Sequence, residues 1–152
     1  MPNPGEIRII DGKAKVWIPA SASSGDVTAT LAIPHRKTLS IRRENFELSG
    51  EISILNIEGT GELREIVIVA NNKINMIPKI DGVDMLYGRN RYDEFSTASV
   101  HSKTIEARYD DPNYIVGLNN IHFLNTVDIR VLFDSLTVIS NLICIYDVYG
   151  DK

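Results

Sequence analysis

Apolar and polar residues alternate along much of the chain, with the two-residue period of a β-strand. The clearest case is VDIRVLFD at residues 127–134, in which Val, Ile, Val and Phe occupy every second position. Residues 27–33 and 105–109 repeat this alternation over shorter stretches. A strand that buries only one of its faces has this pattern. Because we find no convincing amphipathic helix, the pattern predicts a protein built from β-strands.

Short turn sequences separate the expected strands. Asp11-Gly12 lies between two apolar segments, a position in which an Asp-Gly pair favours a two-residue hairpin turn. Asp81-Gly82 ends another apolar stretch, and a single helical turn is expected at Tyr92–Phe95. With turns this frequent, we predict an all-β fold. The expected architecture is one antiparallel β-sandwich or jelly roll of about eight to ten strands, spanning residues 1–152 as a single domain.

Two of the expected strands are apolar on both faces. Leu63–Ala70 is almost continuously apolar, and residues 142–145 read LICI. A sandwich buries only one face of each sheet, so the second apolar face must contact either a covering loop or another subunit. Subunit contact is the preferred interpretation, and it predicts a homo-oligomer. The candidate interface residues are Ile66, Ile68, Ile139, Ile143 and Ile145.

Length and composition fit one compact domain without a membrane span. The chain has 152 residues, of which 43% are apolar, and a domain of this size buries roughly 70% of the surface of its extended chain. No apolar run approaches the roughly 18 residues of a transmembrane helix. The first ten residues, MPNPGEIRII, lack the basic start and the apolar core of a secretory signal. We therefore expect no membrane partner.

The charge distribution argues against a nucleic-acid-binding protein. The net charge is −4, whereas such proteins usually carry a basic excess or a basic stripe. The exception is a basic cluster, which consists of His35, Arg36, Lys37, Arg42 and Arg43. Protection of an exposed sheet edge is the simpler interpretation of this cluster. Contact with a phosphate or with an acidic neighbouring subunit is the alternative.

The sequence lacks the common motifs of enzymes and metal sites. It contains no GxSxG, HExxH, Walker A, CxxC or EF-hand sequence, and its three histidines are far apart. The single cysteine, Cys144, lies in an apolar run and is expected to act as a small hydrophobic residue. Oxygen ligands for calcium could come from Asp81 and Asp84, or from Asp110, Asp111 and Asn113, although turn formation is their simpler role. We therefore predict a non-enzyme with no catalytic residue, cofactor or metal.

An irregular segment at residues 87–99 combines aromatic rings with arginines. Aromatic faces and guanidinium groups both serve in the binding of sugars and of proteins. Packing of this loop against the strands is the simpler interpretation. If the loop binds a partner, a surface glycan is a candidate ligand. The candidate contact residues are Tyr87, Arg89, Arg91 and Tyr92.

Two segments resemble β-sandwich structural proteins of tailed phages and related viruses. In residues 61–86, a Gly-Glu-Leu start leads through an Ile/Val strand and an Asn-containing turn to a second strand that ends in Ile-Asp-Gly. Residues 114–149, with IHFLNTVDIRVLF and a closing IYDVYG, are similar in style to the final strands of those proteins. The resemblance covers about half of the chain and assigns no functional residue.

The resemblance implies a non-enzymatic virion component, such as a capsid decoration, minor capsid or tail protein, that works by adhesion between subunits. The expected partners are further copies of the chain and other virion proteins, and the expected location is the virion. The alternative is a carbohydrate-binding β-sandwich module that is extracellular or attached to a cell surface.

Overall fold

The structure, a computed structural model, contains two compact units. The described residues are 7–10, 13–18, 27–32 and 35–150. The smaller unit comprises Met1–His35 with Gly150–Lys152, and the larger unit comprises Arg36–Tyr149. The prediction of a single domain over residues 1–152 stays a prediction.

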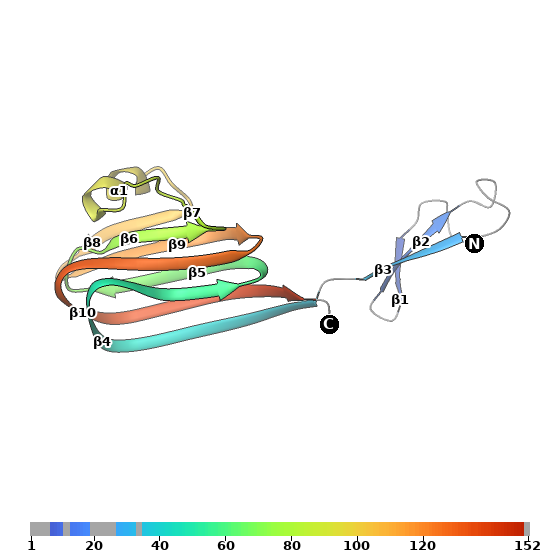
Figure 1. Ribbon diagram of the computed structural model, residues 1–152, viewed down its shortest axis with the longest axis horizontal. Coiled ribbons are helices and arrows are strands. Elements are labelled where there is room, and N and C mark those ends of the chain that lie inside the picture. The colour runs from blue at the N-terminus through green and yellow to red at the C-terminus, as the bar shows by residue number, and fades with distance from the viewer. Residues whose placement is uncertain (1–6, 11–12, 19–26, 33–34, 151–152) are drawn as a thin grey trace. The chain divides into compact units, whose positions relative to one another are not determined.

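The smaller unit contains a three-stranded antiparallel sheet in the order β1-β2-β3 (Figure 1). Its strands are β1 (Ile7–Ile10), β2 (Lys13–Ile18) and β3 (Val27–Ala32). Ile10 lies opposite Lys13, which is the pairing that a two-residue hairpin requires. The predicted turn residues, Asp11 and Gly12, lie outside the described residues.

The larger unit is a seven-stranded sheet in the order β7-β6-β10-β5-β9-β8, with β4 also paired to β10. The pairs of β10 with β5 and β6, and of β9 with β5 and β8, are antiparallel. The strands are β4 (His35–Glu58), β5 (Thr60–Ala70), β6 (Asn75–Ile80), β7 (Val83–Asp84), β8 (Ile105–Asp110), β9 (Asn113–Phe123) and β10 (Thr126–Gly150).

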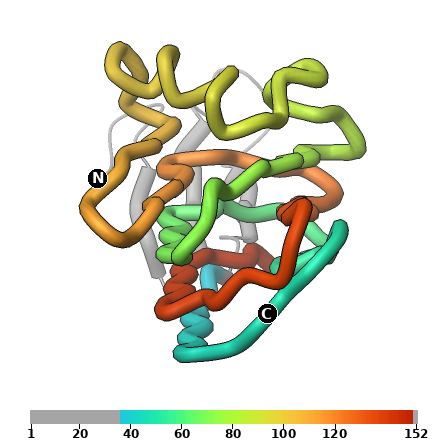
Figure 2. Tube along the Cα trace, turned by 90° about the vertical axis from the view of Figure 1, so that its left-hand side faces the viewer, coloured from blue at the N-terminus to red at the C-terminus, as the bar shows by residue number. Residues whose placement is uncertain are grey.

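The long strand β10 gives the sheet its curl. It pairs with β6 through residues 127–132 and with β5 through residues 139–149. Since only residues 71–74 separate β5 from β6, both strands follow the same edge of β10, which bends between its two paired segments. Figures 1 and 2 show one sheet that folds over on itself as an open half-barrel. The all-β prediction is confirmed, but a closed sandwich or jelly roll is not.

Two β-bulges decide which side chains face the core. Between β5 and β10 the register shifts by one residue at Arg64 and again at Ser140. Such a shift moves the next side chains of the strand to the opposite face. Ile139 therefore faces the core at 1% exposure, while Ile143 faces outward at 37%. Strict alternation places these two residues on the same face, and the bulge at Ser140 breaks that alternation.

The hydrophobic core fills the inside of the curl. Side chains from β4, β5, β6, β9 and both halves of β10 contribute to it. The helix α1 (Tyr92–Ser99), which is longer than the single turn expected at Tyr92–Phe95, adds Tyr92 and Phe95. Burial raises the pKa of the Cys144 thiol to about 12, in keeping with a small hydrophobic residue. Core members with almost no exposed surface include Leu63, Ile66, Ile68, Met76, Leu118, Ile129 and Leu142.

Asp81 joins the turn after β6 to the turn between β9 and β10. Its carboxylate accepts hydrogen bonds from the backbone N–H groups of Leu124 at 3.1 Å, Asn125 at 2.6 Å and Thr126 at 3.0 Å. The bond from Asn125 is the largest cause of the lowered pKa of Asp81, followed by those from Thr126 and Leu124. Because N–H donors point at this carboxylate, it caps a turn, which is the simpler of the two roles considered for it.

We expect this carboxylate to make the stability of the larger unit depend on pH. The pKa of Asp81 lies below its ordinary value of 3.8 in the folded chain. Its contribution to stability is therefore complete above that value and is lost as the pH falls through the folded pKa. The variant Asp81→Asn keeps an acceptor oxygen and tolerates the backbone φ of +51°, but it cannot ionise.

The measurement is thermal unfolding of both proteins from neutral pH to about pH 2. The variant should be less stable than the wild type at neutral pH, and it should lose less stability on acidification. The same loss in both proteins would show that the ionised form of Asp81 contributes nothing.

Candidate functional site

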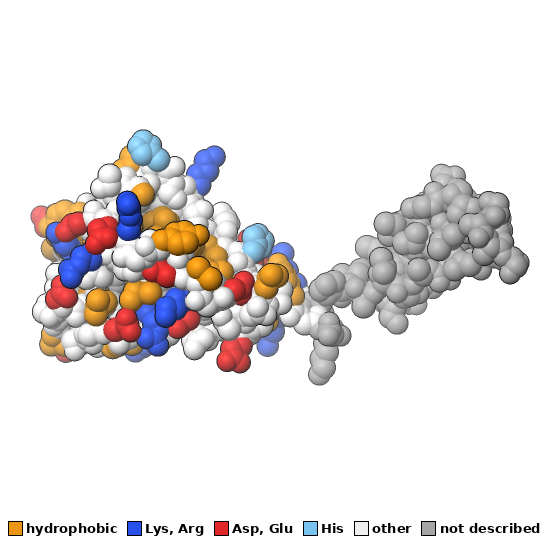
Figure 3. Space-filling view, turned by 45° about the horizontal axis from the view of Figure 1, so that its top comes forward, with side chains coloured by type: hydrophobic (Ala, Val, Ile, Leu, Met, Phe, Trp, Pro, Cys, Tyr) orange, Lys and Arg blue, Asp and Glu red, His pale blue; other side chains and the backbone are white. Residues whose placement is uncertain are grey.

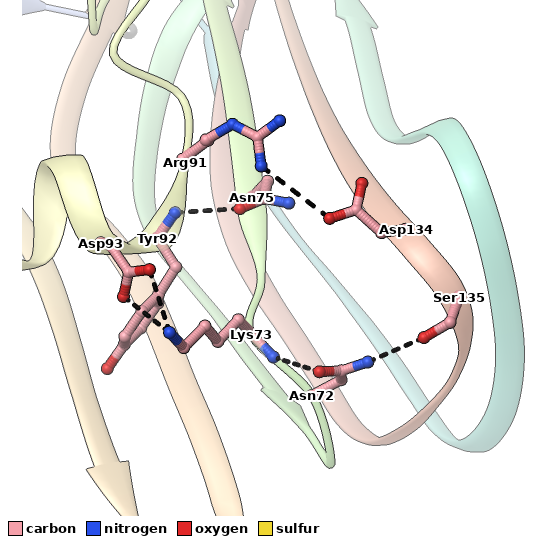
Figure 4. Close-up of polar contacts among 8 residues, drawn as sticks. All are labelled: Asn72, Lys73, Asn75, Arg91, Tyr92, Asp93, Asp134 and Ser135. Carbon is pink, nitrogen blue, oxygen red and sulfur yellow. Dashed lines mark hydrogen bonds and ion pairs between the residues drawn. The ribbon is translucent and has the colours of Figure 1, made fainter.

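A polar cleft lies where the sheet bends. Its volume is about 330 Å³, at the small end of the range for ligand sites. Its walls come from the link between β5 and β6, the start of α1, and the bend of β10 (Figure 4). The lining residues are Asn72, Lys73, Asn75, Arg91, Asp93, Asp134 and Ser135.

Polar contacts of different lengths connect the three walls. Lys73 Nζ lies 2.9 Å from each carboxylate oxygen of Asp93. Asn72 Nδ2 donates a hydrogen bond to Ser135 Oγ at 3.0 Å. The third contact is looser, since 3.9 Å separates Arg91 from Asp134 and this distance exceeds that of a hydrogen bond (Figure 4). The polar contacts across the cleft are therefore tightest at Lys73 and loosest between Arg91 and Asp134.

Asn75 is the buried polar residue of the cleft. Only 7% of its surface is exposed. Its Oδ1 accepts a hydrogen bond at 3.0 Å from the backbone N–H of Tyr92, at the start of α1. Because only the oxygen of the amide can accept, this bond fixes the orientation of the group. The Nδ2 of Asn75 then points away from Tyr92 and toward the side of Arg91 and Asp134 (Figure 4).

The charges of the cleft balance. Two cations, Lys73 and Arg91, face two carboxylates, Asp93 and Asp134. The hydrogen bond to Asp93, and then the charge of Asp93, raise the pKa of Lys73, so this side chain stays protonated at neutral pH. The cleft thus offers several donors and acceptors within a small volume and has no net charge. Such an arrangement is suited to binding through hydrogen bonds.

The acidic turns carry carboxylates that could in principle bind a metal ion. Within the described part of the chain, no group of three or more His, Cys, Asp and Glu side chains is placed to hold a metal ion. Asp84, the second residue considered for calcium, accepts hydrogen bonds from the backbone N–H groups of Leu86 and Gly88, both at 2.9 Å. Its carboxylate stabilises the loop after β7.

The four predicted loop residues are found in different environments. Arg91 lines the cleft, and Arg89 is exposed outside it. Tyr87 is 85% exposed. The ring of Tyr92 is buried and makes edge contacts with the rings of Phe95 and Tyr114, at centroid distances of 5.9 and 5.2 Å. Of the four, Arg91 alone belongs to the cleft, and the Tyr92 ring serves the core.

Sequence reasoning missed the other residues of the cleft. Lys73 and Asn75 come after an Asn-Asn turn, and Asp134 and Ser135 end an alternating strand, so each pair looks like ordinary loop chemistry. They meet because β10 bends beside the link from β5 to β6. The sequence carries no local signal for that bend.

The outer face of the sheet carries a second candidate surface, here called the outer apolar strip. Pairing places Ile143 beside Val67, and Val69 beside Ile115 on the next strand. Ile143 is the most exposed of the set, and Ile145 is half-buried. The strip consists of Val67, Val69, Ile143 and Ile145, together with Ile115, which is only 8% exposed.

The predicted interface residues divide between the core and this strip. Ile66, Ile68 and Ile139 are at most 1% exposed and belong to the core. Ile143 and Ile145 lie on the outer face. The cause is again the two bulges, because each one reverses the face of the strand on which the following side chains lie. The predicted second apolar face exists, but other residues form part of it.

A buried ionic cluster lies at one end of β10. Asp147 has no exposed surface, and its carboxylate accepts hydrogen bonds from Thr38 Oγ1 at 2.5 Å and Arg64 Nε at 2.6 Å. Arg36 Nε is 3.0 Å away. Burial by itself raises the pKa of Asp147, but the hydrogen bonds from Thr38 and Arg64 and the charge of Arg64 outweigh it and lower the pKa. The cluster therefore ties β4 and β5 to β10.

The predicted basic cluster is largely used within the chain. Arg36 contacts Asp147, Arg42 pairs with Glu44 at 2.5 Å, and Arg43 lies 4.0 Å from the ring centroid of Phe46. The side chain of His35 lies outside the described residues. On the face seen in Figure 3, positive and negative side chains are interspersed among apolar ones. That face shows no basic stripe of the kind that binds a nucleic-acid backbone.

The sequence matches no protein-family model and no curated protein. Among the described residues, no helix is long and apolar enough to cross a membrane. A functional proposal for this chain therefore rests on the geometry of the polar cleft and of the outer apolar strip.

Proposed function

We propose that the chain is a non-enzymatic structural protein of a virion, a capsid decoration, minor capsid or tail component, that assembles through the outer apolar strip. The observation that carries this proposal is the strip itself, in which exposed Ile143 and half-buried Val67, Val69 and Ile145 lie on neighbouring strands of the outer face beside the buried Ile115. The sequence resemblance to virion β-sandwich proteins suggests that the assembly is a virus particle. That the curled sheet belongs to a β-sandwich or jelly-roll fold is part of the same proposal.

The proposed occupant of the strip is a second copy of the chain. Val67, Ile143 and Ile145 lie on a sheet face, and a sheet face can pack against the same face of a second sheet. Such packing removes apolar side chains from water, which favours association. The regular geometry of a sheet also allows many identical contacts in a repeating particle.

Light scattering coupled to size-exclusion chromatography tests the proposal. The full chain should elute as a defined oligomer whose population falls on dilution. A monomer at all concentrations would contradict assembly through the strip. The virion assignment has a separate test, because the coding sequence should lie among capsid, portal or tail genes; an unrelated gene neighbourhood would overturn that part.

The alternative function is a carbohydrate-binding module. The polar cleft favours it, since hydrogen-bond donors and acceptors converge there. The Tyr92 ring, which the sequence suggested as a stacking platform, is buried and does not support it. A monomer that binds glycans would favour this alternative over a virion structural protein.

A further inference from the structure

We propose that the polar cleft binds one neutral, hydroxyl-rich sugar unit, held by Asn75, Arg91 and Asp134. This inference rests on the carbohydrate-binding alternative given above, for which it names the ligand class and the residues, and it is independent of the proposed assembly. The cleft and the outer apolar strip share no residue, so either could fail without the other. A virion protein that carried both would assemble through one surface and contact a glycan through the other.

The buried amide of Asn75 is the first support for a sugar site. With Oδ1 held by the N–H of Tyr92, the Nδ2 group is directed into the cleft, and it makes no hydrogen bond with any residue that the structure describes. A buried donor without a partner costs free energy, so groups of this kind are normally satisfied. A ligand oxygen in the cleft would satisfy it.

The gap between Arg91 and Asp134 is the second support. Their closest nitrogen and oxygen atoms are 3.9 Å apart, too far for a direct hydrogen bond. A hydroxyl group placed beside them can accept a hydrogen bond from the guanidinium and donate one to the carboxylate. A carboxylate oxygen can only accept, and the negative charge of a carboxylate or a phosphate would be repelled by Asp134.

The charge balance of the cleft is the third support. Lys73 is already held by Asp93 through two contacts of 2.9 Å. The remaining pair, Arg91 and Asp134, is neutral as a unit. An anion or a cation would therefore gain one favourable charge contact and one unfavourable contact, whereas a neutral polyol would use both groups. The volume of about 330 Å³ has room for one sugar ring.

The test is a titration of the isotope-labelled full chain, followed by NMR. The probes are the methyl glycosides of glucose, galactose, mannose and N-acetylglucosamine, with inorganic phosphate and acetate as charged comparisons. At least one glycoside should shift the side-chain NH₂ signals of Asn75 and the Nε–H signal of Arg91. Phosphate and acetate should leave both signals unchanged.

Two variants and one control make the test specific. Asn75→Asp keeps the acceptor for the Tyr92 N–H but replaces the donor in the cleft, and Asp134→Asn changes an exposed carboxylate with little risk to folding. Each should weaken glycoside binding about tenfold or more, the usual effect of losing a hydrogen bond to a charged or buried group. Asp110→Asn, a matched change at an exposed residue outside the cleft, should bind as the wild type does.

Two results would overturn the proposal. One is the absence of any glycoside-induced shift at Asn75 and Arg91 up to the solubility limit of the probes. The other is a response to phosphate or acetate in place of the glycosides, which would identify an anion site. Glycoside binding that survives in the folded Asp134→Asn variant would remove Asp134 from the site, and with it the proposed role of the gap.

Discussion

Replacing Ile143 with aspartate should abolish self-association and leave the larger unit folded. Ile143 is the most exposed residue of the outer apolar strip, at 37%, so an aspartate there can remain in water in the monomer. In an assembled particle the same carboxylate would be buried without a partner, which is strongly unfavourable. Light scattering should report a monomer, while thermal unfolding stays cooperative with a midpoint close to that of the wild type.

Two further variants define what that result means. Leu136→Asp changes a residue that is 64% exposed and lies outside the strip, so it should affect neither assembly nor folding. Leu142→Asp, at the neighbouring core position with 2% exposure, should prevent folding. If Ile143→Asp behaves like Leu142→Asp, the outer face is covered within the chain. If it assembles like the wild type, the interface lies elsewhere.

Replacing Gly61 with alanine should destabilise the larger unit by about 3 kcal/mol or more, as overpacking against rigid backbone does. Gly61 lies at the start of β5, where an added Cβ would overlap the backbone carbonyl oxygen of Asp147 and lie 2.9 Å from Cζ of Phe123. The carbonyl belongs to the paired strand and cannot move without breaking the sheet. Urea denaturation, with the midpoint and slope fitted together, gives the free energy of unfolding.

Gly50→Ala is the matched control for this prediction. Gly50 has a φ of +73°, and an added Cβ there meets no atom within 4 Å. The substitution should therefore cost only the backbone strain of a left-handed residue, roughly 1–2 kcal/mol. An equal loss of stability in both variants would show that the contact with Asp147 and Phe123 relaxes easily, and that close approach is not the reason for glycine at position 61.

The sequence predicts local structure well where one periodic signal acts alone. The alternation of residues 127–133 correctly places Val127, Ile129, Val131 and Phe133 in the core. In the doubly apolar stretch Leu63–Ala70, Val67 and Val69 lie half-buried on the outer face while Ile66 and Ile68 lie in the core. Each of these arrangements needs only the two-residue period of a strand, which the structure preserves over those stretches.

Prediction fails where a single residue changes the period. Arg64 and Ser140 are ordinary residues for a strand, yet each is the extra residue of a bulge, and each reverses the facing of the residues beyond it. The interface prediction for Ile139 depended on the stretch that contains Ser140. The polar cleft could not be predicted for a related reason. The bend of β10 brings its residues together, and residues 133–138 contain no glycine or proline that would indicate a bend.

The central position of β10 also constrains the order in which the larger unit can form. The β8–β9 hairpin and the β5–β9 pair join segments that are synthesised before β10. The pairings of β10 with β4, β5 and β6 can form only once β10, the last of these strands, has been synthesised, and they span long stretches of sequence. Pairings of this kind form slowly, and unpaired strand edges attract other chains. Synthesis at high local concentration, as when many copies are made at once, is therefore the stage at which wrong pairing most threatens this fold.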